Sequence, residues 1–118
     1  MNNPKIKIKG DHVNGKNVII CQKKSELQIQ AECVKWFNNS YPELRGLFFG
    51  VKNNSLNKIQ GAHDKAIGMY KGVSDFVFLY RGTCYLIEFK TADGRQLPDQ
   101  VRWQKRVEDH GFKYVIMR

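Results

Sequence analysis

Two carboxylates and a lysine stand at positions that a single tight turn would bring together. Residues 73–80 and 83–90 are both rich in aromatic and branched side chains, which favour β-strands. Between them lies Arg81-Gly82, whose glycine can adopt a positive φ. A two-residue turn at this point joins the strands in a register that places Asp75 directly opposite Glu88.

This register would concentrate negative charge on one face of the hairpin. Directly opposed residues have Cβ atoms ~5 Å apart, where two carboxylates repel each other. Lys90 shares the face of Glu88, because strand side chains alternate. A hard divalent cation such as Mg²⁺ or Mn²⁺ takes oxygen ligands, and a nearby lysine can stabilise developing negative charge. We therefore predict a metal site at Asp75 and Glu88; the alternative is a chance Glu-x-Lys on an exposed strand.

The same residues resemble the signature of the PD-(D/E)XK nuclease superfamily, with Ser74 where a proline is usual. That signature is Asp75, twelve intervening residues, and then Glu88-Phe89-Lys90. Three runs are similar to motifs of its VRR-NUC branch: Gly68-Met-Tyr-Lys-Gly72-Val-Ser-Asp75, Gly94-Arg-Gln-Leu97-Pro-Asp-Gln100-x-x-Trp103 and Gly111-Phe-Lys-Tyr114-Val115. The resemblance covers about residues 25–117. It implies an α/β fold, with a restriction-endonuclease-like core in which helices flank a central mixed β-sheet.

The resemblance also implies an activity, the metal-dependent endonucleolytic hydrolysis of DNA phosphodiester bonds. Asp75 and Glu88 would bind Mg²⁺ or Mn²⁺. The backbone carbonyl of Phe89 would join them and, directly or through water, so would Glu26. Lys90 would orient the attacking water or stabilise the transition state, a role that suits a compact point charge.

A helix is predicted at about 25–38, with Ser25 as its N-cap. Its inward stripe would contain Ile29, Cys33, Trp36 and Phe37. Glu26 falls within that stripe, whereas Glu32 lies at its flank. In the resembled family the first helix supplies a glutamate near the metals in a Glu-x-x-Ile-Gln context, which only Glu26 matches. The alternative role for Glu26 is to stabilise the positive end of the helix dipole.

The last helix is predicted at about 98–110, because proline suits a first turn and Gly111 ends the pattern. Its inward stripe is Gln100, Trp103, Gln104 and Val107. In the resembled family the glutamine corresponding to Gln100 lies beside the catalytic lysine. The alternative is an amide that caps the end of the sheet.

Residues 47–51 are predicted to form a strand, and residues 60–67 a short helix. Family members usually carry Pro-Asn-Gly after the strand, where this chain has Lys52-Asn53-Asn54. Gly68 and Gly72 permit a tight turn of the chain, the glycine loop, just before Asp75. Lys65 precedes this loop and Lys71 lies between its two glycines, so we predict that both contact phosphates; the alternative is a solvated surface pair.

The charge of the chain favours a polyanionic partner. Twenty Lys and Arg against 11 Asp and Glu give a net charge of +9 over 118 residues, which is one domain in length. Residues 1–24 hold six Lys and one Asp, or +5 of that charge. They form either a disordered basic tail or an added hairpin that turns at Asn14-Gly15. The hairpin would offer Lys5, Lys7 and Lys9 to a phosphate backbone, ahead of a nuclease domain at 25–118.

Several classes are excluded or disfavoured. No apolar run approaches the ~20 residues of a membrane span, and we expect no signal peptide. Cys21, Cys33 and Cys84 are odd in number and lack CxxC spacing, which is typical of reduced thiols in an intracellular protein. The three histidines stand too far apart to predict a zinc site.

The resemblance to stand-alone phage and bacterial members implies a homodimer that cuts branched DNA, including four-way (Holliday) junctions. It also implies the cytoplasm of a bacterium or of an infected host cell. Two alternatives remain open: a non-catalytic basic module that binds DNA or RNA, and a flap or restriction-type nuclease that uses the same site.

Overall fold

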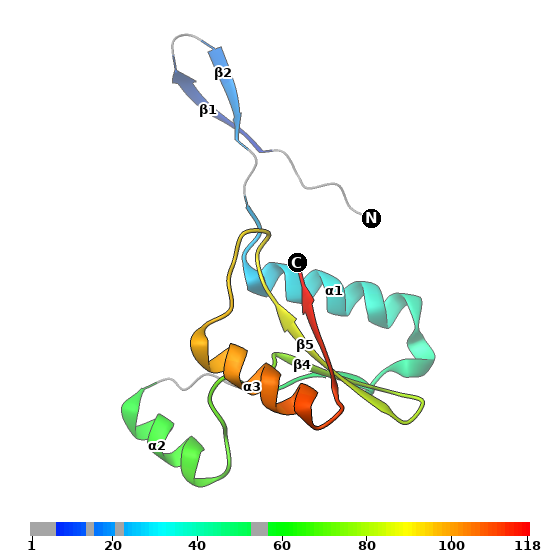
Figure 1. The fold of residues 1–118 in the computed structure, drawn as a ribbon. Coiled ribbons are helices and arrows are strands. Elements are labelled where there is room, and N and C mark those ends of the chain that lie inside the picture. Colours follow the sequence, from blue (N-terminus) through cyan, green and yellow to red (C-terminus); the bar gives the residue numbers. More distant parts are fainter. Residues whose placement is uncertain (1–6, 14–15, 21–22, 53–56) are drawn as a thin grey trace.

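The structure is a computed structural model that describes residues 7–13, 16–20, 23–52 and 57–118. Figure 1 shows its elements in chain order. They are β1 (Lys7–Val13), β2 (Lys16–Ile20), α1 (Glu26–Ser40), a 3₁₀ turn (Pro42–Leu44), β3 (Phe48–Gly50), α2 (Lys58–Ala66), β4 (Phe76–Tyr80), β5 (Thr83–Phe89), α3 (Pro98–Asp109) and β6 (Lys113–Met117).

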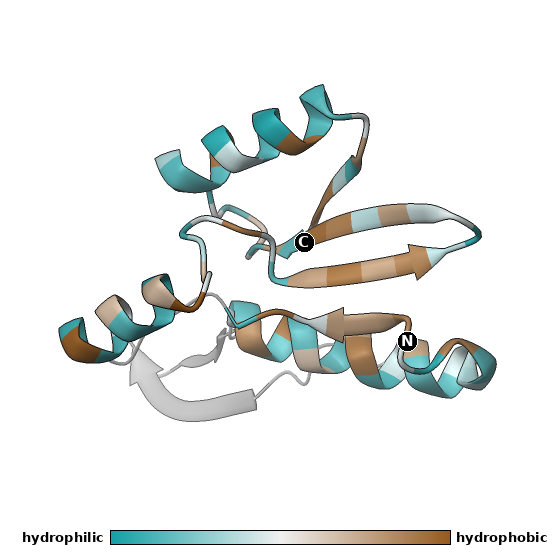
Figure 2. Cartoon of the chain, turned by 90° about the horizontal axis from the view of Figure 1, so that it is seen from below, coloured by the Kyte–Doolittle hydropathy of each residue, from teal (hydrophilic) through white to brown (hydrophobic). Residues whose placement is uncertain are grey.

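The central sheet has the strand order β3-β4-β5-β6. Neighbours β3/β4 and β4/β5 are antiparallel, whereas β5 and β6 run parallel. The chain crosses from β5 to β6 through α3, which covers one face of the sheet, while α1 covers the other (Figure 2). The predicted α/β class with a central mixed sheet is confirmed.

The hairpin turn follows from two residues with positive φ. Arg81 has φ 47° and Gly82 has φ 76°, so both central positions are left-handed, as a type I′ turn requires. This turn matches the right-handed twist of the strands it joins. It pairs Tyr80 with Thr83 and Phe76 with Ile87, which is the predicted register.

The predicted helices form, with small shifts at their ends. Ser25 caps α1: its hydroxyl accepts a hydrogen bond from the Gln28 amide at 3.2 Å, and the Gln28 side chain accepts one from the Ser25 amide at 2.9 Å. The helix α2 begins two residues earlier than predicted, because Asn57 supplies the cap and accepts from the Gln60 amide at 2.8 Å.

The core lies between α1 and one face of the sheet. Its buried members are Phe37, Phe48, Phe76, Ile87 and Phe89. Trp36, predicted to face inward, is instead 55% exposed. The buried stripe of α1 is centred on Phe37, which leaves the neighbouring Trp36 at its edge, with its ring 5.9 Å from that of Tyr41.

The strands β1 and β2 form a separate antiparallel sheet of two strands. Lys7 and Lys9 belong to β1, whereas Lys5 and the Asn14-Gly15 turn lie outside the described residues, as does Asn53. Among the described helices, none is long and apolar enough to cross a membrane.

Candidate functional site

Asp75 stands where β4 begins, beside the last residues of β5. Its Oδ2 accepts a hydrogen bond from the Phe89 amide at 2.8 Å. Continued by one pair, the β4–β5 register places Asp75 opposite Glu88, as predicted. The hydrogen bond fixes this carboxylate against β5. Phe89 thus joins the site through its amide, and the role predicted for its carbonyl stays a prediction.

Glu88 is fully buried, with an exposed fraction of 0%. Neither of its side-chain oxygens has a hydrogen-bond partner of normal geometry within the described part of the chain. Burial raises the pKa of the Glu88 carboxyl above its ordinary value, and the positive charge of Lys90 opposes that rise. A fully buried carboxylate is costly to keep ionised, and the charge of Lys90 together with the side chains of Gln96 and Tyr114 favours its ionised form.

Lys90 directly follows β5, and only 5% of it is exposed. Its amide donates to the Met117 carbonyl at 2.9 Å, which ties its backbone to the end of β6. Its Nζ lies 3.8 Å from Oε1 of Glu26, in the first turn of α1. The structure therefore gathers Asp75, Glu88, Lys90 and Glu26 at one end of the sheet.

Gln96 and Tyr114 complete this polar cluster, and sequence reasoning assigned no role to either. The side-chain amide of Gln96 donates a hydrogen bond from Nε2 to Oε1 of Gln104 at 2.8 Å. It also donates a weaker one to the Tyr114 hydroxyl at 3.4 Å. Burial, followed by the nearby charge of Glu88, raises the pKa of Tyr114 above its ordinary value. The role of Tyr114 could have been predicted from the parallel pairing of β5 with β6, because this pairing places Tyr114 on the same face of the sheet as Glu88.

Gln100 lies in the first turn of α3. Its Oε1 accepts a hydrogen bond from the Leu97 amide at 2.7 Å. One end of this side chain therefore caps the helix, and the proposed position beside Lys90 stays a prediction.

Lys65 and Lys71 line a cavity of about 650 Å³ between α2, the glycine loop and α3, whose lining includes neither Asp75 nor Glu88. Lys71 Nζ is 3.4 Å from Oδ2 of Asp99. The predicted pair thus faces a concave surface, at the start of the segment that leads into Asp75.

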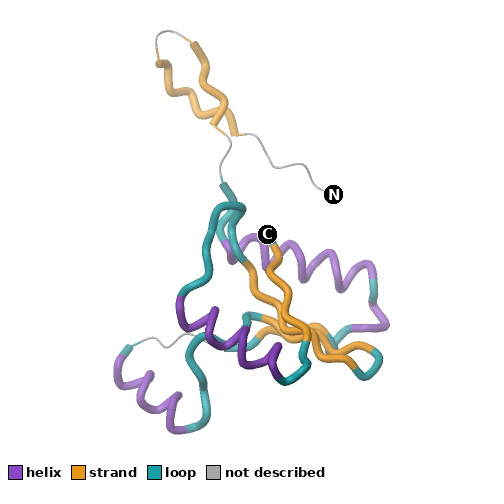
Figure 3. Tube along the Cα trace, in the orientation of Figure 1, coloured by secondary structure: helices purple, strands orange, loops and turns teal. Residues whose placement is uncertain are grey.

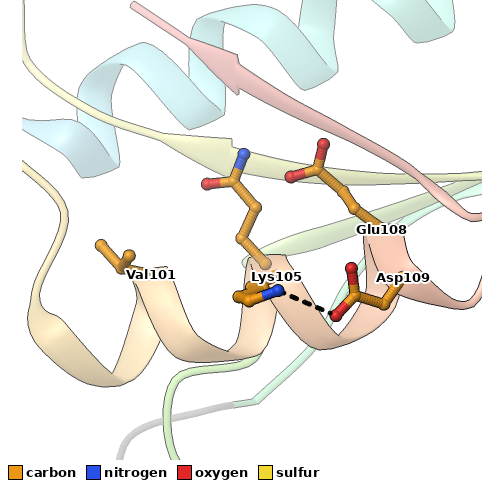
Figure 4. Close-up of a pocket in the computed structure, with 5 residues that line it drawn as sticks. Val101, Lys105, Glu108 and Asp109 are labelled. Carbon is orange, nitrogen blue, oxygen red and sulfur yellow. Dashed lines mark hydrogen bonds and ion pairs between the residues drawn. The ribbon is translucent and has the colours of Figure 1, made fainter.

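A second, shallower depression lies on α3, as Figure 4 shows. Its lining residues all come from that helix, and its dashed contact joins Lys105 to Asp109 at 3.2 Å. It includes neither of the opposed carboxylates nor Lys90, so we assign it no part in the site.

The donor set at the end of the sheet suits a hard cation in its chemistry, since it combines two opposed carboxylates, one of them buried and unsatisfied. Within the described ranges, no group of three or more His, Cys, Asp and Glu side chains is close enough to hold a metal ion. Glu26, which is directed to Lys90, does not complete such a group here.

Comparisons with protein-family models, with curated proteins and with solved structures found no match to this chain.

Proposed function

We propose that this protein is a metal-dependent endodeoxyribonuclease with a restriction-endonuclease-like core of the VRR-NUC type. The observation that carries the proposal is the buried Glu88 carboxylate, which lies across the hairpin from Asp75 and shares its strand end with Lys90. Two acids and a lysine in this arrangement match the chemistry of phosphodiester hydrolysis.

Asp75 and Glu88 would hold the cation, Mg²⁺ or Mn²⁺, with the Phe89 carbonyl as a further ligand and with Glu26 joining directly or through water. When bound, it would lower the pKa of water and neutralise charge on the scissile phosphate. The hydrogen bond from the Phe89 amide orients Asp75 before any ligand arrives. Lys90 supplies a fixed positive charge for the developing negative charge of the transition state.

The proposed substrate is branched DNA, bound by a homodimer in the cytoplasm. A net charge of +9 supports a polyanionic partner, and two copies of the site would cut two strands symmetrically. Light scattering on the purified protein tests the dimer, with a mass of twice 13.7 kDa as the expected result.

The decisive experiment compares end-labelled four-way junctions, flaps and plain duplexes with the wild-type protein in Mg²⁺, in Mn²⁺ and in EDTA. We expect metal-dependent cuts, with the junction cleaved fastest. Preferential cleavage of flaps or duplex would keep the chemistry and change the substrate. A lack of cleavage of all three DNAs in both metals would overturn the proposal.

A non-catalytic basic binding module is the second candidate, and the complete burial of Glu88 favours it. In a binding module, Glu88 would be a remnant of an active site that no substrate reaches and that no longer takes part in catalysis. In that case Mg²⁺ would neither stabilise the protein against heat nor change its affinity for DNA, whereas a nuclease site would show stabilisation.

A further inference from the structure

The cavity beside the glycine loop has a lining unlike that of the carboxylate site. Its volume is about 650 Å³. Its lining combines cations, aromatic rings and two acids: Lys65, Lys71, Arg102, Arg106, Tyr70, Trp103, Asp64 and Asp99. In Figure 1 the glycine loop connects α2 to the sheet near the start of α3.

The glycine loop packs tightly against the start of α3. Gly72 has φ +91°, and a Cβ at this position would lie 2.6 Å from the Asp99 carbonyl oxygen. Only glycine satisfies both the left-handed backbone and the close approach. The cavity wall formed by the loop is therefore held against α3.

Asp99 organises two of the cations. One of its carboxylate oxygens contacts Arg102, and the other lies 3.4 Å from Lys71. Burial acts to raise the pKa of Asp99, but Arg102 and Lys71 outweigh it and the pKa is lowered. Oδ2 of Asp64 lies 3.9 Å from Nζ of Lys52, and its Oδ1 accepts a hydrogen bond from the Gln60 side-chain amide at 2.6 Å. The four lining cations outnumber these two acids, so the cavity favours an anion.

Two aromatic side chains offer surface to a planar ligand. Tyr70, on the glycine loop, is 60% exposed. Trp103 is half-buried, and its ring rests edge-on against Tyr114 with 6.1 Å between ring centres. The exposed ring of Tyr70 and the ring of Trp103, which is packed against Tyr114, lie beside several cations. Aromatic rings beside cations are the combination that binds unpaired bases together with their phosphates.

We propose that this cavity binds one unpaired nucleotide of a DNA strand. The base stacks on Tyr70 and Trp103, while Arg102, Arg106 and Lys65 contact the flanking phosphates. A paired base in a duplex is already stacked and cannot enter a concave space that admits a single base, so the cavity selects strand ends, gaps or branch points. The proposal rests on the proposed function for its choice of DNA, but it does not require cleavage.

The cavity is connected to the carboxylates by a short segment. Lys71, the last residue of the loop that lines the cavity, and Asp75 are four residues apart, which limits their Cα separation to about 14 Å. A nucleotide in the cavity would therefore place its neighbours along the strand within reach of the proposed scissile position. This gives the preference for branched DNA a structural origin that the carboxylates alone do not supply.

Trp103 provides a direct readout, because the chain contains only one other tryptophan, Trp36 on α1. In the W36F variant, stacking of a base on Trp103 should quench its fluorescence. We would titrate this variant in EDTA with a short oligothymidine, the matching duplex, and thymidine monophosphate. The expected result is saturable quenching by the single strand, with much weaker quenching by the duplex.

Two substitutions in the W36F background test the lining. Tyr70→Ala should weaken binding of the single strand by about 5- to 150-fold, the range expected for one base–aromatic stack. Arg106→Ala should reduce the slope of log affinity against log salt by about 0.7, the loss of one phosphate contact. Its matched control is Lys105→Ala, which removes the same charge from the neighbouring position but lies outside the cavity.

The outcomes separate this inference from the proposed function. Quenching without cleavage in Mg²⁺ would leave the inference standing and overturn the nuclease. Cleavage without quenching of Trp103 would overturn the inference alone. Equal quenching by duplex and single strand, or quenching by the free nucleotide only, would also overturn it. The W103F variant, which reports from the exposed Trp36, should show no change on addition of DNA.

Discussion

The two faces of the central sheet are built from alternate residues of the same strands, yet they differ in almost every physical property. On the α1 face, ring centres lie 4.5 Å apart between Phe37 and Phe48 and 4.6 Å apart between Phe48 and Phe76. On the other face, and just beyond the end of β5, Glu88 and Lys90 carry charge and are almost completely buried. One face is an aromatic core, and the other holds charged groups at a cost in stability.

The difference between the faces shows that neighbouring residues at the end of β5 have separate tasks, some in the stability of the fold and others in the proposed chemistry. Ile87 and Phe89 belong to the aromatic core, whereas Glu88 and Lys90 belong to the polar cluster. Because strand side chains alternate, the packing of Phe89 also fixes the direction of its two charged neighbours. A change on the aromatic face should therefore lower stability, whereas a change on the polar face should lower activity and can raise stability.

The largest expected effect is on cleavage. Asp75→Asn, Glu88→Gln and Lys90→Ala should each reduce the cleavage rate at saturating Mg²⁺ by at least about a hundredfold, as does loss of one charge-stabilising group in other enzymes. Each should keep the circular dichroism spectrum of the wild type, because the aromatic face is untouched. Lys105→Ala is the matched control and should cut normally. Turnover near the wild-type rate in any of the three would remove that residue from the mechanism.

The second effect is on stability and concerns the opposite face. Phe37→Ala should lower the free energy of unfolding by about 3–5 kcal/mol, since it leaves a cavity among packed rings. The neighbouring Trp36→Ala, at an exposed position, should cost only about 1 kcal/mol. Urea denaturation of both variants measures the difference. Equal losses would show that the packed side of α1 is misidentified.

The hairpin could be predicted because its signals are local. The Arg81-Gly82 turn defines the register, and alternation then places Asp75, Glu88 and Lys90 on one face without any tertiary information. The exposure of Trp36 was not predictable in the same way. Helical periodicity identifies a broad stripe, but only the position of the sheet decides which edge of that stripe is covered.

The environment of the site depends on contacts between distant segments, which no local pattern encodes. Gln96 reaches Gln104 and Tyr114 from the loop before α3, which Figure 3 shows running back from the end of β5. The cavity at Lys65 and Lys71 likewise depends on how the glycine loop meets α3. Loop geometry of this kind follows from tertiary packing rather than from spacing.

The third effect tests the cost of the polar face. The pKa of Glu88 is raised in the folded state, so the folded protein binds a proton on this carboxylate more tightly than the unfolded chain does. Stability should therefore fall as the pH rises from the ordinary carboxyl range through the raised pKa. Glu88→Gln removes this dependence and should raise the melting temperature at neutral pH in EDTA by about 4 °C, which corresponds to about 1 kcal/mol in a domain of this size.

Two measurements accompany that variant. The gain in melting temperature should shrink at pH values below the ordinary carboxyl pKa, where both states of the wild type are protonated. Added Mg²⁺ should stabilise the wild type and leave Glu88→Gln unchanged, because binding to the folded state alone shifts the equilibrium. A variant less stable than the wild type at neutral pH would contradict the assignment of Glu88 as a costly buried charge.

The smallest effect concerns the glutamates of α1. Glu26 lies 3.8 Å from Lys90 Nζ with half of its side chain exposed, whereas Glu32 lies 2.6 Å from the Nζ of Lys24. Where Glu26 reaches the metal only through water, Glu26→Gln should slow cleavage by up to about fivefold, because solvent weakens its attraction to Lys90 as it weakens the pair of Glu32 and Lys24. Glu32→Gln, the matched control, should leave the rate unchanged, because Lys24 lies outside the polar cluster. A larger loss for Glu26→Gln, above about a hundredfold, would instead indicate that Glu26 binds the metal directly. Equal rates for the two variants would show that the contact with Lys90 has no role in turnover.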